Sequence, residues 1–156
     1  MDNVQKKLIR GVFKLWESAQ ANESLTFYNQ EIPDIGDVAA TTNVLIRVPL
    51  GCPHPFRPPR KNVHIRKNMM DLITGNRDEV AFDTGETKTV NRNTVVKKIA
   101  RGTEDDIVFV TKALWSYVPL SVKGIDVYAN WFVRVYAVGE ELPVVIIACI
   151  RERGGK

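Results

Sequence analysis

The residues of this sequence with the most distinctive chemistry are two cysteines and two histidines. Cys52 and His54 lie two residues apart, His64 follows ten residues later, and Cys149 lies near the end of the chain. Thiolate and imidazole are preferred ligands of Zn²⁺, but these spacings match neither a His-Glu-x-x-His motif nor the paired spacing of structural zinc sites. The sequence also has no glycine-rich phosphate loop. We therefore expect no metal, no cofactor and no small-molecule substrate, and we expect the thiols to be reduced.

One triplet, Asp83-Thr84-Gly85, has the residue types of a known catalytic motif. With the preceding apolar residues from Val80, it resembles the apolar-apolar-Asp-Thr-Gly signature of retroviral-type aspartic proteases. The resemblance implies that Asp83 would be the catalytic carboxylate and would share one proton with its twin in a second subunit. Glu86 stands where that family has a small residue, and the segment from Ile146 to Cys149 lacks the glycine of the family's later bracing segment. Because Asp-Thr-Gly is also an ordinary turn sequence, we expect a non-enzyme and keep a dimeric aspartic protease as the second alternative.

Basic residues outnumber acidic ones and are unevenly distributed. The formal net charge is +4 and the pI about 9.1, a milder bias than dedicated nucleic-acid-binding domains show. If these cations lie on one surface, they would attract a phosphate backbone or an anionic membrane. The alternative is that they only form a solvated face. A further basic segment comprises Lys88, Arg92, Lys97, Lys98 and Arg101. The candidate anion-binding residues are Lys6, Lys7, Arg10, Lys14, Arg60, Lys61, Arg66 and Lys67.

An amphipathic helix is predicted over residues 1–22. Asp2 is a suitable N-cap, and apolar residues recur at helical spacing, with basic residues on the opposite face. Such an apolar stripe usually docks on a sheet as part of the core, whereas an exposed stripe would bind a partner or a membrane surface. Its candidate partner-contact residues are Leu8, Val12, Leu15 and Trp16.

The rest of the chain, residues 25–150, predicts a β-rich core in a single domain spanning residues 1–156. Alternating or continuous β-branched and aromatic segments, separated by turn residues, are typical of strands. The fold class is therefore α+β, with a mixed or antiparallel sheet or sandwich behind the N-terminal helix. A second, short helix is expected at Thr94 to Ala100. The expected strands are Leu25 to Asn29, Asn43 to Leu50, Met69 to Ile73, Ile107 to Thr111, Trp115 to Val118, Ile125 to Tyr128, Trp131 to Val138 and Pro143 to Ile150.

The segment from Cys52 to Arg60 contains four prolines and must be an extended loop, because proline fixes φ and removes backbone donors. Long irregular loops and open sheet edges suit proteins that assemble with copies of themselves. We expect this loop to contact partners through Cys52, Pro53, Phe56 and Pro58.

The first third of the chain resembles small subunits of tailed-phage necks and tail terminators. The resemblance rests on Leu25 to Asn29, a proline-containing spacer and Val44 to Val48, all after an N-terminal helix. It implies a ring- or shell-forming virion assembly component, a homo-oligomer that binds other assembly proteins. We expect it in the virion after assembly in the host cytoplasm, without secretion, since there is no signal peptide and the longest apolar run, Val144 to Ile150, is too short to cross a bilayer. The alternative is a basic peripheral module that binds nucleic acid or an anionic membrane.

Overall fold

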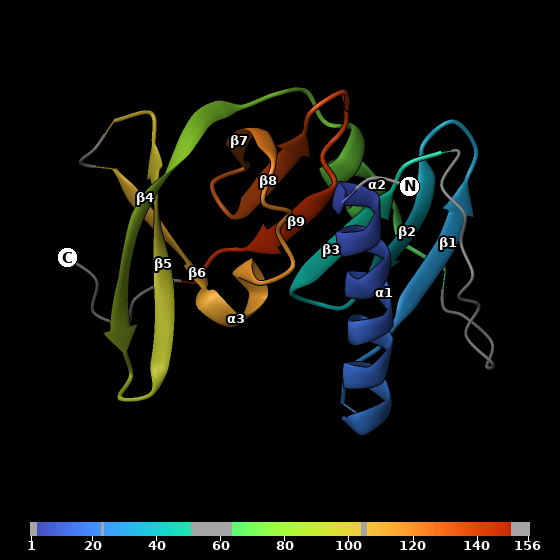
Figure 1. The fold of residues 1–156 in the computed structure, drawn as a ribbon, viewed down its shortest axis with the longest axis horizontal. Coiled ribbons are helices and arrows are strands. Elements are labelled where there is room, and N and C mark those ends of the chain that lie inside the picture. Colours follow the sequence, from blue (N-terminus) through green and yellow to red (C-terminus); the bar gives the residue numbers. More distant parts are fainter. Residues whose placement is uncertain (1–2, 23, 51–63, 104–105, 151–156) are drawn as a thin grey trace.

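A computed structural model describes residues 3–22, 24–50, 64–103 and 106–150. Within these residues the chain forms three helices and one nine-stranded antiparallel sheet, which confirms the expected α+β class (Figure 1). The helices are α1 (Asn3–Ala21), α2 (Lys67–Thr74) and α3 (Lys112–Trp115). The strands are β1 (Tyr28–Ile32), β2 (Gly36–Ala40), β3 (Val44–Val48), β4 (Glu79–Val90), β5 (Thr94–Arg101), β6 (Ile107–Thr111), β7 (Val122–Tyr128), β8 (Phe132–Ala137) and β9 (Val145–Ala148).

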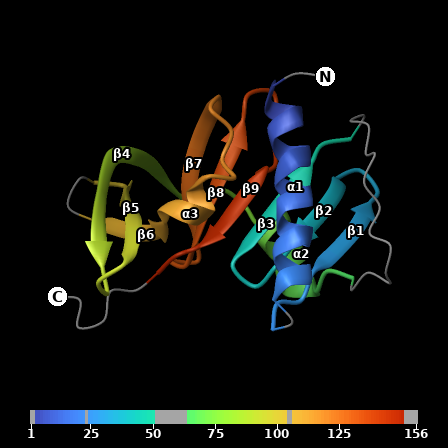
Figure 2. The same cartoon turned by 60° about the horizontal axis from the view of Figure 1, so that its bottom comes forward.

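The sheet curls strongly at one end. Its strand order is β1-β2-β3-β9-β8-β7-β4-β5-β6. The last strand, β6, comes back to the residues that follow β9, where the Ile150 amide donates to the Phe109 carbonyl at 2.7 Å. The six strands from β9 round to β6 thus form an almost closed barrel, whereas β1 to β3 extend from it as an open sheet (Figure 2).

Each face of the open sheet is covered by one helix, α1 on one and α2 on the other (Figure 1). Val44, Ile46 and Val48 point into the α1 core, as their alternation predicted, and the intervening Leu45 points into the α2 core. Gly11 lets α1 approach closely, because a Cβ there would lie 2.7 Å from Ile46 Cδ1. Side-chain alternation across the strands therefore divides the apolar residues between two cores.

The C-terminal strands also follow the sequence pattern. Val133 and Val135 of β8 face the α1 core, while Phe132 faces the α2 core. In β9, Ile147 and Ile146 lie on opposite faces and both are buried, which confirms the expectation that the continuous apolar run is covered on both sides.

Two segments have secondary structure opposite to the prediction. Met69 to Ile73, expected as a strand, lies in α2, where Ile73 is buried on the face that covers the second core. Thr94 to Ala100, expected as a helix, is strand β5, which pairs with β4 and β6 and buries Val96 and Ile99. Both segments are short, and their tertiary partners decide between helix and strand.

Other boundaries differ more locally. Trp115 to Val118 is not a strand, because the Thr111 hydroxyl accepts a hydrogen bond from the Leu114 amide and starts α3. The first strand begins at Tyr28 rather than Leu25 and continues to Ile32. The polar region after Gly75, expected as a loop, contains the longest strand, β4, with most of its residues exposed. No helix in the described part of the chain is long and apolar enough to span a membrane.

Candidate functional site

Strands β4 and β7 share only a short ladder before they separate. The ladder pairs Glu79 with Val127 and ends where Ala81 meets Ile125, although β4 continues to Val90 and β7 begins at Val122. Beyond Ala81, β4 pairs with β5 alone among the described strands. This fork leaves one edge of β4 without a partner among the described strands, and Figure 1 shows β4 curving away from β7. An unpaired edge presents free backbone N–H and C=O groups.

The fork opens into a groove of about 900 Å³, closed on its third side by the connection from α3 to β7. Its walls are largely apolar and include Val80 and Phe82 of β4, Trp115 of α3, and Leu120 of the connection. Val80 and Phe82 are 75% and 43% exposed, and Leu120 is fully exposed. Large apolar side chains so placed around a hollow are typical of a binding surface.

The charged residues of the groove have a positive excess. Lys7, Arg77 and Lys123 lie on its lining together with Asp78, Asp83 and Asp126. Asp126 is neutralised by Arg134 at 2.6 Å and Asp83 by Lys97 at 3.1 Å, and neither cation lines the groove. Among the described lining residues, this leaves the single carboxylate of Asp78 against the three cations. The rim therefore favours a ligand with negative charge.

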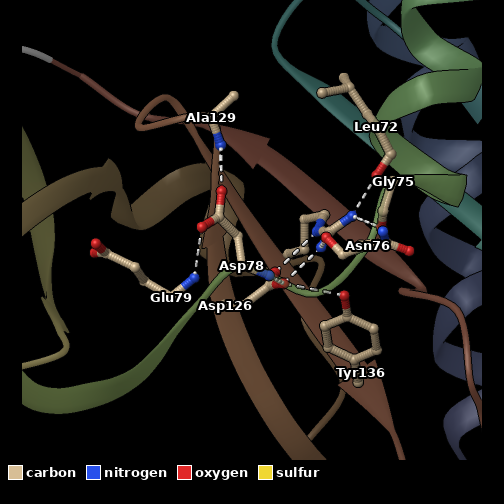
Figure 3. A network of polar contacts seen from close by, with 9 residues as sticks. Leu72, Gly75, Asn76, Asp78, Glu79, Asp126, Ala129 and Tyr136 are labelled. Atoms are coloured by element: carbon tan, nitrogen blue, oxygen red, sulfur yellow. Dashed lines mark hydrogen bonds and ion pairs between the residues drawn. The ribbon is translucent and has the colours of Figure 1, made fainter.

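A buried ion pair holds the closed end of the fork. Arg134 of β8 is fully buried, and its Nε and Nη2 donate to the two carboxylate oxygens of Asp126 in β7 at 2.8 and 2.6 Å. The same guanidinium donates to the carbonyl oxygens of Leu72, Gly75 and Asn76 at 2.9–3.1 Å. Of these five hydrogen bonds, three join the residues at the end of α2 to the sheet and two join β8 to β7 (Figure 3), and such a planar fork is specific to arginine.

A second carboxylate connects this network to β4. The Asp78 amide donates to Asp126 Oδ2 at 3.1 Å, while the carboxylate of Asp78 accepts from the amides of Glu79 and Ala129 at 2.9 and 3.2 Å (Figure 3). These three hydrogen bonds lie beside the Glu79–Val127 pair, at which the ladder between β4 and β7 begins. They fix where β4 leaves the sheet, and so they position the groove wall.

Aromatic rings enclose the ion pair. The Arg134 guanidinium lies 4.3 Å from the centroid of the Tyr128 ring, and Arg77 lies 4.3 Å from that of Tyr136. Burial, together with the negative charge of Asp126, raises the pKa of Tyr136 to about 12. Its hydroxyl, 3.3 Å from Asp126 Oδ2, is therefore a neutral hydrogen-bond donor at physiological pH.

The predicted partner-contact stripe of the helix lies mainly in the core. Leu8, Val12 and Leu15 are buried against the sheet, and Trp16 is half-buried. The condition for our prediction, an exposed stripe, is therefore not met. The other predicted contacts, Cys52, Pro53, Phe56 and Pro58, lie outside the described residues.

The described anion-binding candidates do not form one surface. Those of α1, Lys6, Lys7, Arg10 and Lys14, lie on the helix that covers one face of the sheet. Arg66 and Lys67 are exposed at the start of α2, which covers the opposite face. Arg60 and Lys61 are outside the described residues. Only Lys7 of these candidates lines the groove.

Asp83 lies in an irregularity of β4 rather than in a turn between elements. The register of β4 against β5 shifts between Asp83 and Thr87, and Gly85 has a φ of 78° within this bulge. The Asp83 carboxylate accepts from the Gly85 amide at 2.8 Å and pairs with Lys97. The triplet is thus a β-bulge whose aspartate is already bound to an ammonium group.

The predicted absence of a metal site stays a prediction. No group of three metal-ligating side chains occurs within the described residues, where His64 is exposed and Cys149 is half-buried and free. Cys52 and His54 lie outside them.

Cys149 is expected to react slowly in the folded protein. Burial raises its pKa to about 11 from an ordinary value of 9, so the thiolate fraction at pH 8 falls about 100-fold. In a Cys52→Ser variant, alkylation by iodoacetamide should be slower by about that factor in buffer than in 6 M urea, as followed by mass spectrometry. Equal rates in both conditions would contradict this assignment.

The unpaired edge of β4 was not predicted from the sequence. The signal was present in Val80 and Phe82, two apolar residues at alternating positions of a polar segment, but the pattern was attributed to the Asp-Thr-Gly triplet.

Comparisons of this chain with protein-family models, curated proteins and solved structures find no match.

Proposed function

We propose that this chain is a non-enzymatic assembly component, a subunit that joins copies of itself and other assembly proteins into a ring or shell. The observation that carries this proposal is a group of exposed apolar side chains at one end of the sheet. We name it the apolar end, and it consists of Leu50, Leu120 and Val138.

Strand pairing brings these three residues to the same end. Ile46 of β3 and Val135 of β8 both pair with Val145, so β3 and β8 run in the same direction and finish together. Val122 pairs with Ala137, so β7 begins there as well. Leu50 and Val138 follow β3 and β8, and Leu120 precedes β7; the first two are 57% and 72% exposed.

A clustered apolar surface of this kind is stabilised when a second protein covers it. A ring needs a second, different patch on each subunit, because a head-to-tail contact joins unlike surfaces. The outer edge of β1 offers one, since it pairs with no other described strand. The resemblance to tailed-phage neck and tail-terminator subunits makes a virion the setting that we propose for this assembly.

The oligomeric state tests this proposal. Mass photometry of the purified chain should show discrete oligomers, and Val138→Glu should weaken their association at least about tenfold, because a buried carboxylate would replace an apolar contact. Val95→Glu is a matched control, since Val95 is an exposed valine in β5, away from the apolar end. A monomer at millimolar concentration in sedimentation experiments would overturn the proposal.

A further inference from the structure

We propose that the groove between β4 and β7 binds an extended, acidic and apolar segment of a different protein, which adds to β4 as a new strand. This inference rests on the proposed assembly function and names the class of partner and its site. The apolar end serves contacts between copies, whereas the groove receives a heterologous strand. The two sites adjoin at Leu120, which belongs to both, and they are distinguished by Val138 on one side and Phe82 on the other.

The backbone of β4 supplies the first argument. From Phe82 to Val90 no described strand other than β5 pairs with β4, and residues 84–86 of the bulge lie outside that ladder too, although β5 is itself central. In an antiparallel ladder every second residue directs its N–H and C=O groups to each side. Phe82 and Asp83 of this stretch line the groove, so an added strand would enter there and continue along β4. The amides of Gly85 and Glu86 already donate to the side chains of Asp83 and Thr84, and the added strand would satisfy the other groups of β4 on that edge, which is the usual basis of peptide recognition by strand addition.

The side chains supply the second argument. Val80 and Phe82 stand at alternate positions of β4 and line the groove together with Leu120. Alternate residues of an added strand would face these apolar walls, while the intervening ones would face the rim. The ligand therefore needs apolar residues at every second position.

The charge of the groove rim determines which residues the ligand needs between its apolar positions. Lys7, Arg77 and Lys123 form no ion pair with a carboxylate of the described residues, and the Arg77 guanidinium lies over the ring of Tyr136. Acidic residues in the ligand would pair with these three cations. A segment that alternates apolar and acidic residues thus matches both the walls and the rim.

Two other occupants match the groove less well. The open edge of β1 in a second copy turns Tyr28 and Ile32 into its own core, so these apolar side chains are not free to fill the groove. Single-stranded nucleic acid needs a succession of aromatic faces. The groove has Phe82 and Trp115, and the Trp115 ring is already covered by Lys97 at 5.6 Å.

The experiment uses the full chain and labelled ten-residue peptides in fluorescence anisotropy. A peptide of alternating valine and glutamate should bind at least about tenfold more tightly than one of alternating valine and lysine, and its affinity should fall with salt. N-methylation of one alternate set of amides, either those of the valines or those of the glutamates, should abolish binding, and N-methylation of the other set should not, because only one set faces β4. Equal affinity for both charge types, or insensitivity to N-methylation, overturns the proposal.

Variants locate the binding site. Phe82→Asp should weaken binding of the glutamate peptide at least about tenfold and Lys123→Glu several-fold, while Val95→Asp, a change at an exposed valine outside the groove, should leave it unchanged. Tighter binding of oligo(dT) than of the peptide, lost in the same variants, would instead assign the groove to nucleic acid and overturn the peptide proposal.

The oligomeric state of Phe82→Asp separates the two proposals. If the groove takes a heterologous strand, mass photometry should show the wild-type oligomer in this variant although the peptide no longer binds. Loss of the oligomer in Phe82→Asp would show that a second copy occupies the groove, and it would overturn the present inference while leaving the assembly function standing.

Discussion

Replacing Arg134 with alanine is expected to lower the free energy of unfolding by about 3–5 kcal/mol, because it leaves the carboxylate of Asp126 buried without its partner. The change also removes the donors to the carbonyl oxygens of Leu72, Gly75 and Asn76. Urea unfolding followed by circular dichroism would measure the loss.

Arg101→Ala provides a matched control for this prediction. Arg101 also belongs to a strand and pairs with carboxylates, Asp106 at 3.0 Å and Glu79 at 3.2 Å, but these acids are about half exposed. Its removal should cost no more than about 1 kcal/mol, as for surface ion pairs in general. Similar losses of unfolding free energy in the two variants would refute our view that the burial of Asp126 makes the loss of Arg134 more costly.

Removing both charges gives a sharper test. Arg134→Met combined with Asp126→Leu should be less destabilised than the sum of the two single changes, because no uncompensated charge remains. Full recovery is not expected, since the three carbonyl groups at the end of α2 would still lack donors. Strict additivity of the two changes would show that the pair contributes nothing as a pair.

This network links the stability of the fold to the geometry of the candidate site. Asp126 accepts from the Asp78 amide, and Asp78 in turn holds the amide of Ala129. These contacts pin β4 to β7 at the start of the three-residue ladder, and the strands diverge at its other end. The polar cluster therefore holds the two strands together at the closed end of the groove. At the open end, the position of the groove wall is set by β4.

Local sequence patterns predicted the parts of the fold in which alternation and burial coincide. Val44, Ile46 and Val48 alternate with residues that face the other core, and the same is true along β8. Met69 to Ile73 and Thr94 to Ala100 carry no such periodicity, so their structure depends on which elements they contact. The helical structure of α2 is stabilised by burial of Ile73 in the second core, and the strand structure of β5 is stabilised by pairing with a strand on each side.

The candidate site was harder to predict because long-range pairing creates it. The separation of β4 from β7 depends on a register between residues 79–81 and 125–127, which no local pattern encodes. The basic residues of α1 were identified, but the sequence does not show that Lys7 borders a groove whereas Arg66 lies across the sheet. Exposed valine and phenylalanine at alternating positions were the one local clue.

Alkaline pH is expected to destabilise the protein through Tyr136. Burial and the charge of Asp126 raise the pKa of Tyr136 to about 12 from 10.0, so the folded state favours the neutral phenol. The stabilisation from this group is fully present below pH 10 and is lost as the pH rises through about 12. Two pKa units correspond to about 3 kcal/mol.

A Tyr136→Phe variant isolates this contribution. It should be less stable than the wild type at pH 8, because it lacks the hydrogen bond to Asp126, but its stability should fall less between pH 10 and 12. Urea midpoints across that range would show the two curves converging. Burial also raises the pKa of Cys149, so both proteins should carry Cys149→Ala, which removes the thiol's own loss of stability above pH 9. Parallel curves would mean that ionisation of Tyr136 costs the folded state no more than the unfolded one.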